Sequence, residues 1–385
     1  MKIQRFPKPH KVKVDESVFT SNLSSLGICE TGDYAYLRLN LESQSLESIQ
    51  GIQNYPHLQH VNLSKNRLST IRVLSNLHQL LTLNISHNLL SEIMDFDPPL
   101  NLLYIDASNN SIKSFKKVSK NRFLQRLNLD NNQINEITEI DSLSNFQYLS
   151  LSSNKILRIS NLPTSLQYLN LSKNEIKKIS IGFTKLTFLR VVDLSYNRLA
   201  SLKGCEELES LMILNLAGNL LGRINTLNHL VDLALLSDLD LTGNALCEKV
   251  HFRLRVAYKL PQLRKLGEEA VTAEEKIKAE NLFGLDIEDL KALFNQIFQG
   301  QIFVDRRLET NDMLDIESDS EEDQEYLPSR NTDSKIASRI LSKMNSKEKL
   351  DPVAMSEILA FSRRYVGELI EKEEINRKKE VVFEE

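Results

Sequence analysis

The chain has 385 residues and a formal net charge of −4, with 41% hydrophobic residues, 6% aromatic residues and no tryptophan. This length allows two conventional domains or one elongated repeat array with appendages, and the sparse glycine and proline favour the array. Cys29, Cys205 and Cys247 are far apart and lack CxxC spacing. They therefore predict neither a disulfide framework nor a thiolate metal site, and a reducing compartment fits them best.

Residues 1–14 form a basic N-terminal arm with five lysine or arginine residues and no acid. Pro7 and Pro9 interrupt the arm and no apolar run follows, so we expect no signal peptide. No stretch is apolar enough to span a bilayer, so we expect a cytoplasmic protein without a membrane partner. The arm could contact an acidic surface in a salt-dependent way, or it could be a solvated start of the chain.

Residues 15–35 are expected to form an N-terminal cap. Asp15 would cap a helix. The apolar residues of the following amphipathic lid would be Val18, Phe19, Leu23 and Leu26.

Residues 36–247 repeat one pattern, LxxLxLxxN, in which an asparagine recurs every 20–25 residues. The recurring residues are Asn66, Asn88, Asn110, Asn132, Asn154, Asn174, Asn197, Asn219 and Asn244. The first five are spaced by 22 residues, and a degenerate first copy over 36–52 has Gln44 at the asparagine position. A fixed period of this length is typical of a solenoid.

The repeat dictates how each coil is built. Val61 and Leu63 alternate with His60 and Asn62, so a short strand would point its leucines inward. One coil cannot bury its leucines alone, so coils must stack and their strands must pair in parallel. Each recurring asparagine would satisfy buried backbone groups of the turn. The 22-residue period leaves room only for short 3₁₀ or single-turn helices on the back of the stack.

Residues 248–284 are expected to close the far end of the stack as a C-terminal cap. Val250–Leu260 is predicted to be a helix. A second helix would begin near Thr272, whose hydroxyl can form a capping box with Glu275.

This pattern resembles the 22-residue class of leucine-rich repeats, which occurs in nuclear phosphatase-regulating and axonemal proteins. The segment 258–279 resembles the C-terminal cap motif of that class, with Gly267-Glu268 in place of the usual Asp-Gly. The resemblance implies an α/β fold: a leucine-rich-repeat solenoid in the form of a shallow right-handed horseshoe, with a parallel concave sheet and helical caps.

More narrowly, residues 15–280 are similar to the leucine-rich-repeat protein of radial spokes and to the repeat region of the leucine-rich-repeat guanylate kinase. The similarity rests on Thr31-Gly32-Asp33-Tyr34-Ala35-Tyr36-Leu37 and on Asp95-Phe96-Asp97-Pro98-Pro99-Leu100-Asn101-Leu102. The sequence contains no GxxxxGK[ST] motif, so the kinase half is absent. This resemblance implies an axonemal scaffold in a cilium or flagellum.

The sequence offers no catalytic motif. The seven histidines lack metal-ligand spacing, and no GxSxG or glycine-rich phosphate loop is present. Asp106, Asp193 and Asp240 fall in one column of the concave face, where a ladder of hydrogen-bonded polar residues is a better interpretation than a catalytic carboxylate set. We therefore expect no enzyme activity, no cofactor, no metal, no small-molecule substrate and no nucleic acid.

A neighbouring exposed column of the concave face predicts a protein-binding surface. Its candidate residues, called the concave stripe below, are Tyr104, Arg126, Tyr148, Tyr168, Val191 and Ile213. Tyrosine and arginine are enriched at interface hot spots, and several apolar residues in one column should form a patch. The alternative is that tyrosine only reflects good strand propensity. We expect a peptide or a helix to lie on the stripe.

Three segments follow the cap. Residues 285–308 predict an amphipathic helix that either extends the cap or binds a partner. Residues 309–333 are acidic and predict a disordered linker, in which Ser318 and Ser320 resemble phosphorylation sites of acid-directed kinases. Residues 334–385 predict interaction helices. The longer of these helices has an apolar face made of Met355, Ile358, Leu359, Tyr365, Val366 and Leu369.

Three functions are open at this point: an adaptor in a ciliary assembly such as the radial spoke, a regulatory subunit of a protein phosphatase, and an enzyme. No residue supports the enzyme. The several binding surfaces joined by a flexible stretch favour the adaptor, whose partners would be other proteins.

Overall fold

The structure is a computed structural model, and it describes residues 16–29, 32–93, 95–114, 118–138, 140–179 and 181–284. These residues all belong to the first of two compact units, Met1–Asp305. The predicted basic arm, the segment 285–308, the two serines of the acidic linker and the apolar face of the tail helix lie outside the described residues. No helix of the described part is long and apolar enough to cross a membrane.

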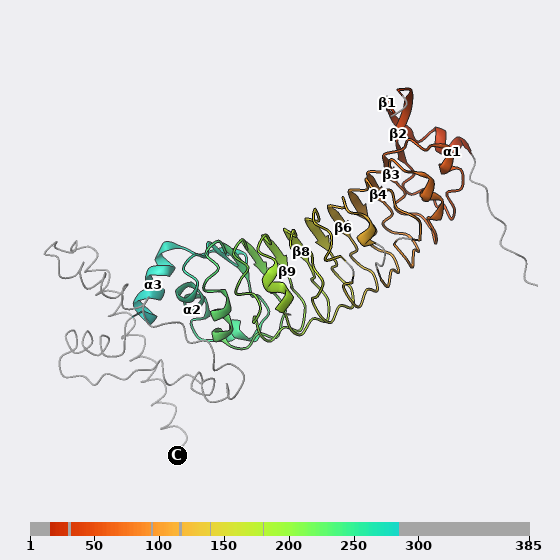
Figure 1. Ribbon diagram of the computed structural model, residues 1–385. Helices are drawn as coiled ribbons and strands as arrows, with labels where there is room; N and C mark the ends of the chain where they lie inside the picture. Colours follow the sequence, from red (N-terminus) through yellow and green to blue (C-terminus); the bar gives the residue numbers. More distant parts are fainter. Residues whose placement is uncertain are drawn as a thin grey trace, which may run out of the picture. The chain divides into compact units, whose positions relative to one another are not determined.

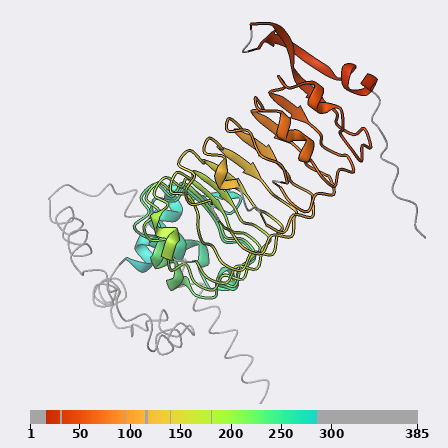
Figure 2. The ribbon, with the colours of Figure 1, turned by 45° about the vertical axis from the view of Figure 1, so that its right-hand side comes forward.

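The described residues form thirteen strands that pair, in sequence order, into one sheet. Figures 1 and 2 show the coils stacked one on another, with the strands along the inner side of a curved array. The strands are β1 Leu23–Ile28, β2 Tyr34–Asn40, β3 His60–Asn62, β4 Thr82–Asn84, β5 Tyr104–Asp106, β6 Arg126–Asn128, β7 Tyr148–Ser150, β8 Tyr168–Asn170, β9 Val191–Asp193, β10 Ile213–Asn215, β11 Asp238–Asp240, β12 Lys265–Leu266 and β13 Glu269–Ala270. Pairing is parallel from β2 to β12 and antiparallel in the two end pairs. The predicted leucine-rich-repeat solenoid is confirmed.

The core follows the alternation in the repeat. Val61 and Leu63 are 2% and 0% exposed, while His60 and Asn62, which alternate with them along the chain, are half-buried. Each strand adds its leucines to the same cluster, so the buried residues form one continuous core through the described part of the chain.

The asparagine ladder is confirmed at atomic detail. The Asn132 side-chain amide donates to the carbonyls of Ala107, Leu129 and Asp130 at 3.0–3.1 Å. Its Oδ1 accepts the backbone N–H of Ile112 at 2.9 Å. One side chain thus satisfies backbone groups in its own turn and in the preceding coil, which ties neighbouring coils together.

Short 3₁₀ helices cover part of the outer side, as the period predicts. They are η1 Ile52–Asn54, η2 Arg72–Asn76, η3 Val118–Lys120, η4 Ile181–Lys185, η5 Ile224–Leu230 and η6 Ala245–Glu248. Each of these helices is short enough to form from the residues that remain in a coil after the strand and its turn.

The N-terminal cap differs from the prediction of an amphipathic lid. Helix α1 is only Glu16–Thr20, and β1 then pairs with β2 as an antiparallel hairpin. Phe19 is buried as expected, but Leu26 is 62% exposed, so its predicted burial was wrong. The hairpin forms because Gly32 adopts a positive φ of 86° in a turn where Cys29 N–H donates to the Asp33 carbonyl.

The C-terminal cap agrees with the prediction and adds one feature. Helix α2 is Phe252–Lys259, and α3, Ala273–Phe283, begins with the predicted capping box between Thr272 and Glu275. Between the helices lies a hairpin, β12–β13, that the sequence did not predict; Gly267 turns it at a φ of 65°. The Arg253 guanidinium donates to the carbonyls of Leu266 and Ala270 and holds the hairpin against α2.

Candidate protein-binding face

The six residues of the concave stripe lie side by side on successive strands, as predicted. Strand register pairs Tyr104 with Arg126, Arg126 with Tyr148, and Tyr148 with Tyr168. The same register continues through Val191 to Ile213. Neighbouring parallel strands lie about 4.8 Å apart, so these side chains form one continuous surface.

The middle of the stripe is ordered by contacts between its own side chains. The rings of Tyr148 and Tyr168 stack with centroids 4.3 Å apart and an angle of 5° between their planes. The Arg126 guanidinium carbon lies 5.5 Å from the centroid of the Tyr104 ring and 6.0 Å from that of Tyr148. A cation at these distances is attracted to the ring face. The three tyrosines and the arginine therefore form a preorganised surface.

The stripe is partly accessible. Tyr104 is 37% exposed and Ile213 is 42% exposed, while Tyr148, Tyr168 and Val191 are half-buried. Burial, with further contributions from Tyr148, Asp193 and Asp130, raises the pKa of Tyr168 to about 12. The Tyr168 hydroxyl therefore remains protonated near neutral pH and can donate a hydrogen bond.

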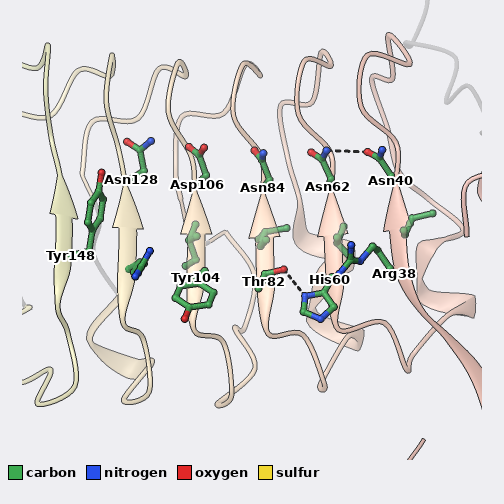
Figure 3. Close-up of a pocket in the computed structure, with 15 residues that line it drawn as sticks. Arg38, Asn40, His60, Asn62, Thr82, Asn84, Tyr104, Asp106, Asn128 and Tyr148 are labelled. Carbon is green, nitrogen blue, oxygen red and sulfur yellow. Dashed lines mark hydrogen bonds between the residues drawn. The ribbon is translucent and has the colours of Figure 1, made fainter. Parts of the chain in front are cut away.

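An open groove of about 740 Å³ occupies the concave face over β2–β7. Figure 3 shows its side chains in two columns, with Arg38 and His60 at the end near the hairpin. His60 Nδ1 is hydrogen-bonded to Thr82 Oγ1 at 2.9 Å, and burial, together with Arg38, lowers the pKa of His60. The sequence prediction missed Arg38. Arg38 directly precedes Leu39 in the degenerate first copy of the repeat, as His60 precedes Val61 in the next copy, and this equivalence could have identified it.

The second column performs a structural task rather than a catalytic one. The Asp106 carboxylate accepts the backbone N–H of Ser108 at 3.0 Å, and Asp193 and Asp240 accept the N–H two residues further on at 2.9 Å. Asparagines of this column make the same turn contact. The column also forms cross-strand bonds, as between the Asn62 amide and Asn40 Oδ1 in Figure 3. The predicted hydrogen-bonded ladder is confirmed, although most of its bonds return to the backbone of the same coil.

The described residues give little support for metal binding or for cysteine chemistry. They contain no group of three or more histidine, cysteine, aspartate or glutamate side chains that could hold a metal ion. Their cysteines, Cys29, Cys205 and Cys247, form no disulfide with one another. Burial raises the pKa of the Cys205 thiol far above its ordinary value, so this thiol is unreactive.

The register and the asparagine ladder define the fold, and a family model described as "Leucine-rich repeat" matches residues 147–290. The described part of the chain has the leucine-rich-repeat fold. Among solved structures, a leucine-rich-repeat protein of Leptospira interrogans aligns with a TM-score of 0.52 and 26% identity, over 59% of each chain. Leucine-rich-repeat proteins generally act as scaffolds for protein–protein interaction, and their repeats are typically non-catalytic.

Two curated relatives match parts of this chain. The human U2 small nuclear ribonucleoprotein A′ is 34% identical over 104 residues, which are 26% of this chain and 41% of that protein. The mouse leucine-rich repeat-containing protein 36 is 37% identical over 99 residues, which are 26% of this chain and 13% of that protein. The match thus covers less than half the length of either relative. The resemblance to radial-spoke proteins remains a prediction.

Proposed function

We propose that this protein is a non-catalytic adaptor that holds a segment of another protein on its concave stripe. The observation that carries the proposal is the stack of Tyr148 on Tyr168 beside Arg126, which is itself held between two rings. Rigid aromatic and arginine side chains lose little conformational freedom on binding, which makes them efficient anchors.

We further propose that the adaptor is a structural component of a ciliary axonemal complex such as the radial spoke, with a cytoplasmic and ciliary location. The resemblance of residues 31–37 and 95–102 to radial-spoke and related repeats supports this role. An adaptor also accounts for further predicted binding segments beyond the cap better than a phosphatase regulator does, because a regulator could end at the cap.

A second candidate, a subunit of a ribonucleoprotein, is favoured by the match to the U2 small nuclear ribonucleoprotein A′. The charge of the β9–β11 part of the concave face argues against direct RNA binding there. Asp193, Asp238 and Asp240 lie on β9 and β11 and would repel phosphates. In this candidate, too, the concave face would bind a protein.

Replacing both Tyr148 and Tyr168 by alanine tests the proposal. The variant should fold normally but lose its partners in a pull-down from ciliated cells, because it lacks the stacked pair. The matched control replaces Phe123 and Phe188, two aromatic residues 51% and 62% exposed that lie outside the stripe. Equal capture by the tyrosine variant and the wild type would contradict the proposal.

Fluorescent tagging of the full chain in a ciliated cell tests the location. Signal along the axoneme supports the ciliary adaptor. Diffuse or nuclear signal contradicts it and favours phosphatase regulation or a ribonucleoprotein role.

A further inference from the structure

Charge is distributed unevenly along the concave face. In the first two side-chain columns, strands β2–β6 carry Arg38, Arg126 and one acid, Asp106. Strands β7–β11 carry Asp193, Asp238 and Asp240 in those columns, and their described residues there include no lysine or arginine. The next first-column residue, Lys265 on β12, lies in register with Asp238 and ends this acidic part of the face. One half of the face is therefore mildly cationic and the other half is anionic.

The anionic half is also the more apolar half. Tyr148, Tyr168, Val191 and Ile213 are the first-column residues of β7–β10, and the acids flank them. Asp193 lies close enough to Tyr168 to influence its ionisation. A surface with an apolar centre and carboxylates along its side complements a segment with the opposite arrangement.

The carboxylates of this half remain available for a partner. Asp193 accepts hydrogen bonds from Ser195 and Asn215, and Asp240 accepts one from the Thr242 N–H. None of the three acids is in an ion pair within the described part of the chain. All three are half-buried, so a cation that reached them would be partly shielded from water.

We infer that the β7–β11 half of the concave face binds a basic amphipathic segment of a partner protein. The apolar side chains of that segment would contact the stripe, and its lysines or arginines would pair with Asp193, Asp238 and Asp240. Arg126 lies at the end of this proposed binding site, because its guanidinium would repel further basic residues of the partner. The inference rests on the proposed function and adds the chemistry of the partner.

Two synthetic helical peptides test this inference on the full chain. One is composed of leucine and lysine with the lysines on one face, and in the other each lysine is replaced by glutamate. Fluorescence anisotropy should show that the leucine–lysine peptide binds at least about tenfold more tightly than its counterpart. Equal affinities, or no binding of either peptide, would overturn the inference.

The decisive variant combines Asp193→Asn with Asp240→Asn. Asparagine keeps the side-chain oxygen that accepts the backbone N–H, and several coils have asparagine at this position, so the fold should be retained. Loss of two ion pairs should weaken binding of the leucine–lysine peptide about tenfold. The same change should not weaken binding of the leucine–glutamate peptide, because it removes two charges that repel glutamate. The control, Glu92→Gln with Glu136→Gln, removes two exposed acids that lie outside the strands and should have no effect.

The outcomes separate the inference from the proposed function. If the tyrosine variant loses its cellular partner while the Asp193/Asp240 variant binds the leucine–lysine peptide as the wild type does, the inference fails and the proposed function stands. If the Asp193/Asp240 variant binds the leucine–lysine peptide more weakly but the Tyr148/Tyr168 variant keeps every cellular partner, the proposed function fails.

Discussion

Asp130 Oδ1 accepts the backbone N–H of Ser152, one coil further on, at 2.6 Å. In the other coils from β2 to β11, that N–H donates to an Asn or Asp side chain two residues earlier in the same strand, as Ser172 does to Asn170. In β7 this position is Ser150, whose side chain is too short for the contact. Ser150 Oγ instead donates to the same Asp130 oxygen at 2.7 Å. Asp130 thus replaces a missing acceptor.

Replacing Asp130 by alanine should therefore lower the free energy of unfolding by about 1–2 kcal/mol, because the Ser152 N–H loses its acceptor. Adding Ser150→Asn should restore most of the loss, since asparagine supplies the acceptor in its usual place. Chemical denaturation of the single and double variants measures both effects. Failure of the second substitution to restore stability would mean that Asp130 acts in another way.

Replacing Asp130 by asparagine should have the opposite effect near neutral pH. Burial raises the pKa of Asp130, so the folded protein binds this proton more tightly than the unfolded chain. The contribution of Asp130 to stability therefore falls as pH rises from its unfolded pKa, about 3.9, through the raised folded pKa. Asp130→Asn should be at least as stable as the wild type at pH 7, and this advantage should vanish in acid. Lower stability of the variant at pH 7 would contradict this account.

Replacing Asn132 by leucine should be among the most damaging changes in the solenoid. It leaves the Ile112 N–H without its acceptor. It also removes one of the two amide donors to the carbonyls of Ala107 and Leu129, which keep their hydrogen bonds from the neighbouring asparagine side chains of the ladder. Each buried unsatisfied group costs about 1–3 kcal/mol. The matched control is Gln44→Ala, because Gln44 occupies the same repeat position but its side chain bonds only the Glu42 carbonyl in the described structure. Thermal unfolding that ranks the two variants equally would contradict the role of the ladder.

Arg253 should make the C-terminal cap sensitive to acid. The hydrogen bond from Arg253 lowers the pKa of Glu275, which also closes the capping box of α3. The stabilisation is present above the unfolded pKa of about 4.3 and is lost as pH falls through the lowered folded value. Hydrogen exchange in α3 and β12–β13 should accelerate across this range. In Arg253→Ala it should be fast already at pH 7; unchanged protection there would contradict the cap contact.

The fold could be predicted almost completely, because each coil buries the same positions. Leu63 is buried in the core and Asn132 bonds the backbone of its turn, and the period of 22 residues repeats each of these positions along the chain. The stripe could be predicted for the same reason, since strand register places Tyr148 beside Tyr168 without any knowledge of loops.

What could not be predicted depends on contacts outside the period. The apolar residues around Leu26 are compatible with a lid or with a hairpin, and the turn at Gly32 decides between them. The role of Asp130 depends on a hydrogen bond between coils, which the repeat does not predict. The uneven distribution of charge along the concave face depends on the strand register.

The measurement that tests the central claim most directly is photo-crosslinking from defined positions of the full chain in ciliated cells. A photoreactive amino acid at position 168 lies in the stripe, while one at position 136 lies in an exposed segment outside the strands. The account predicts that position 168 crosslinks to a discrete partner protein and that position 136 does not. Crosslinking of the same proteins from both positions, or of none from position 168, would contradict it.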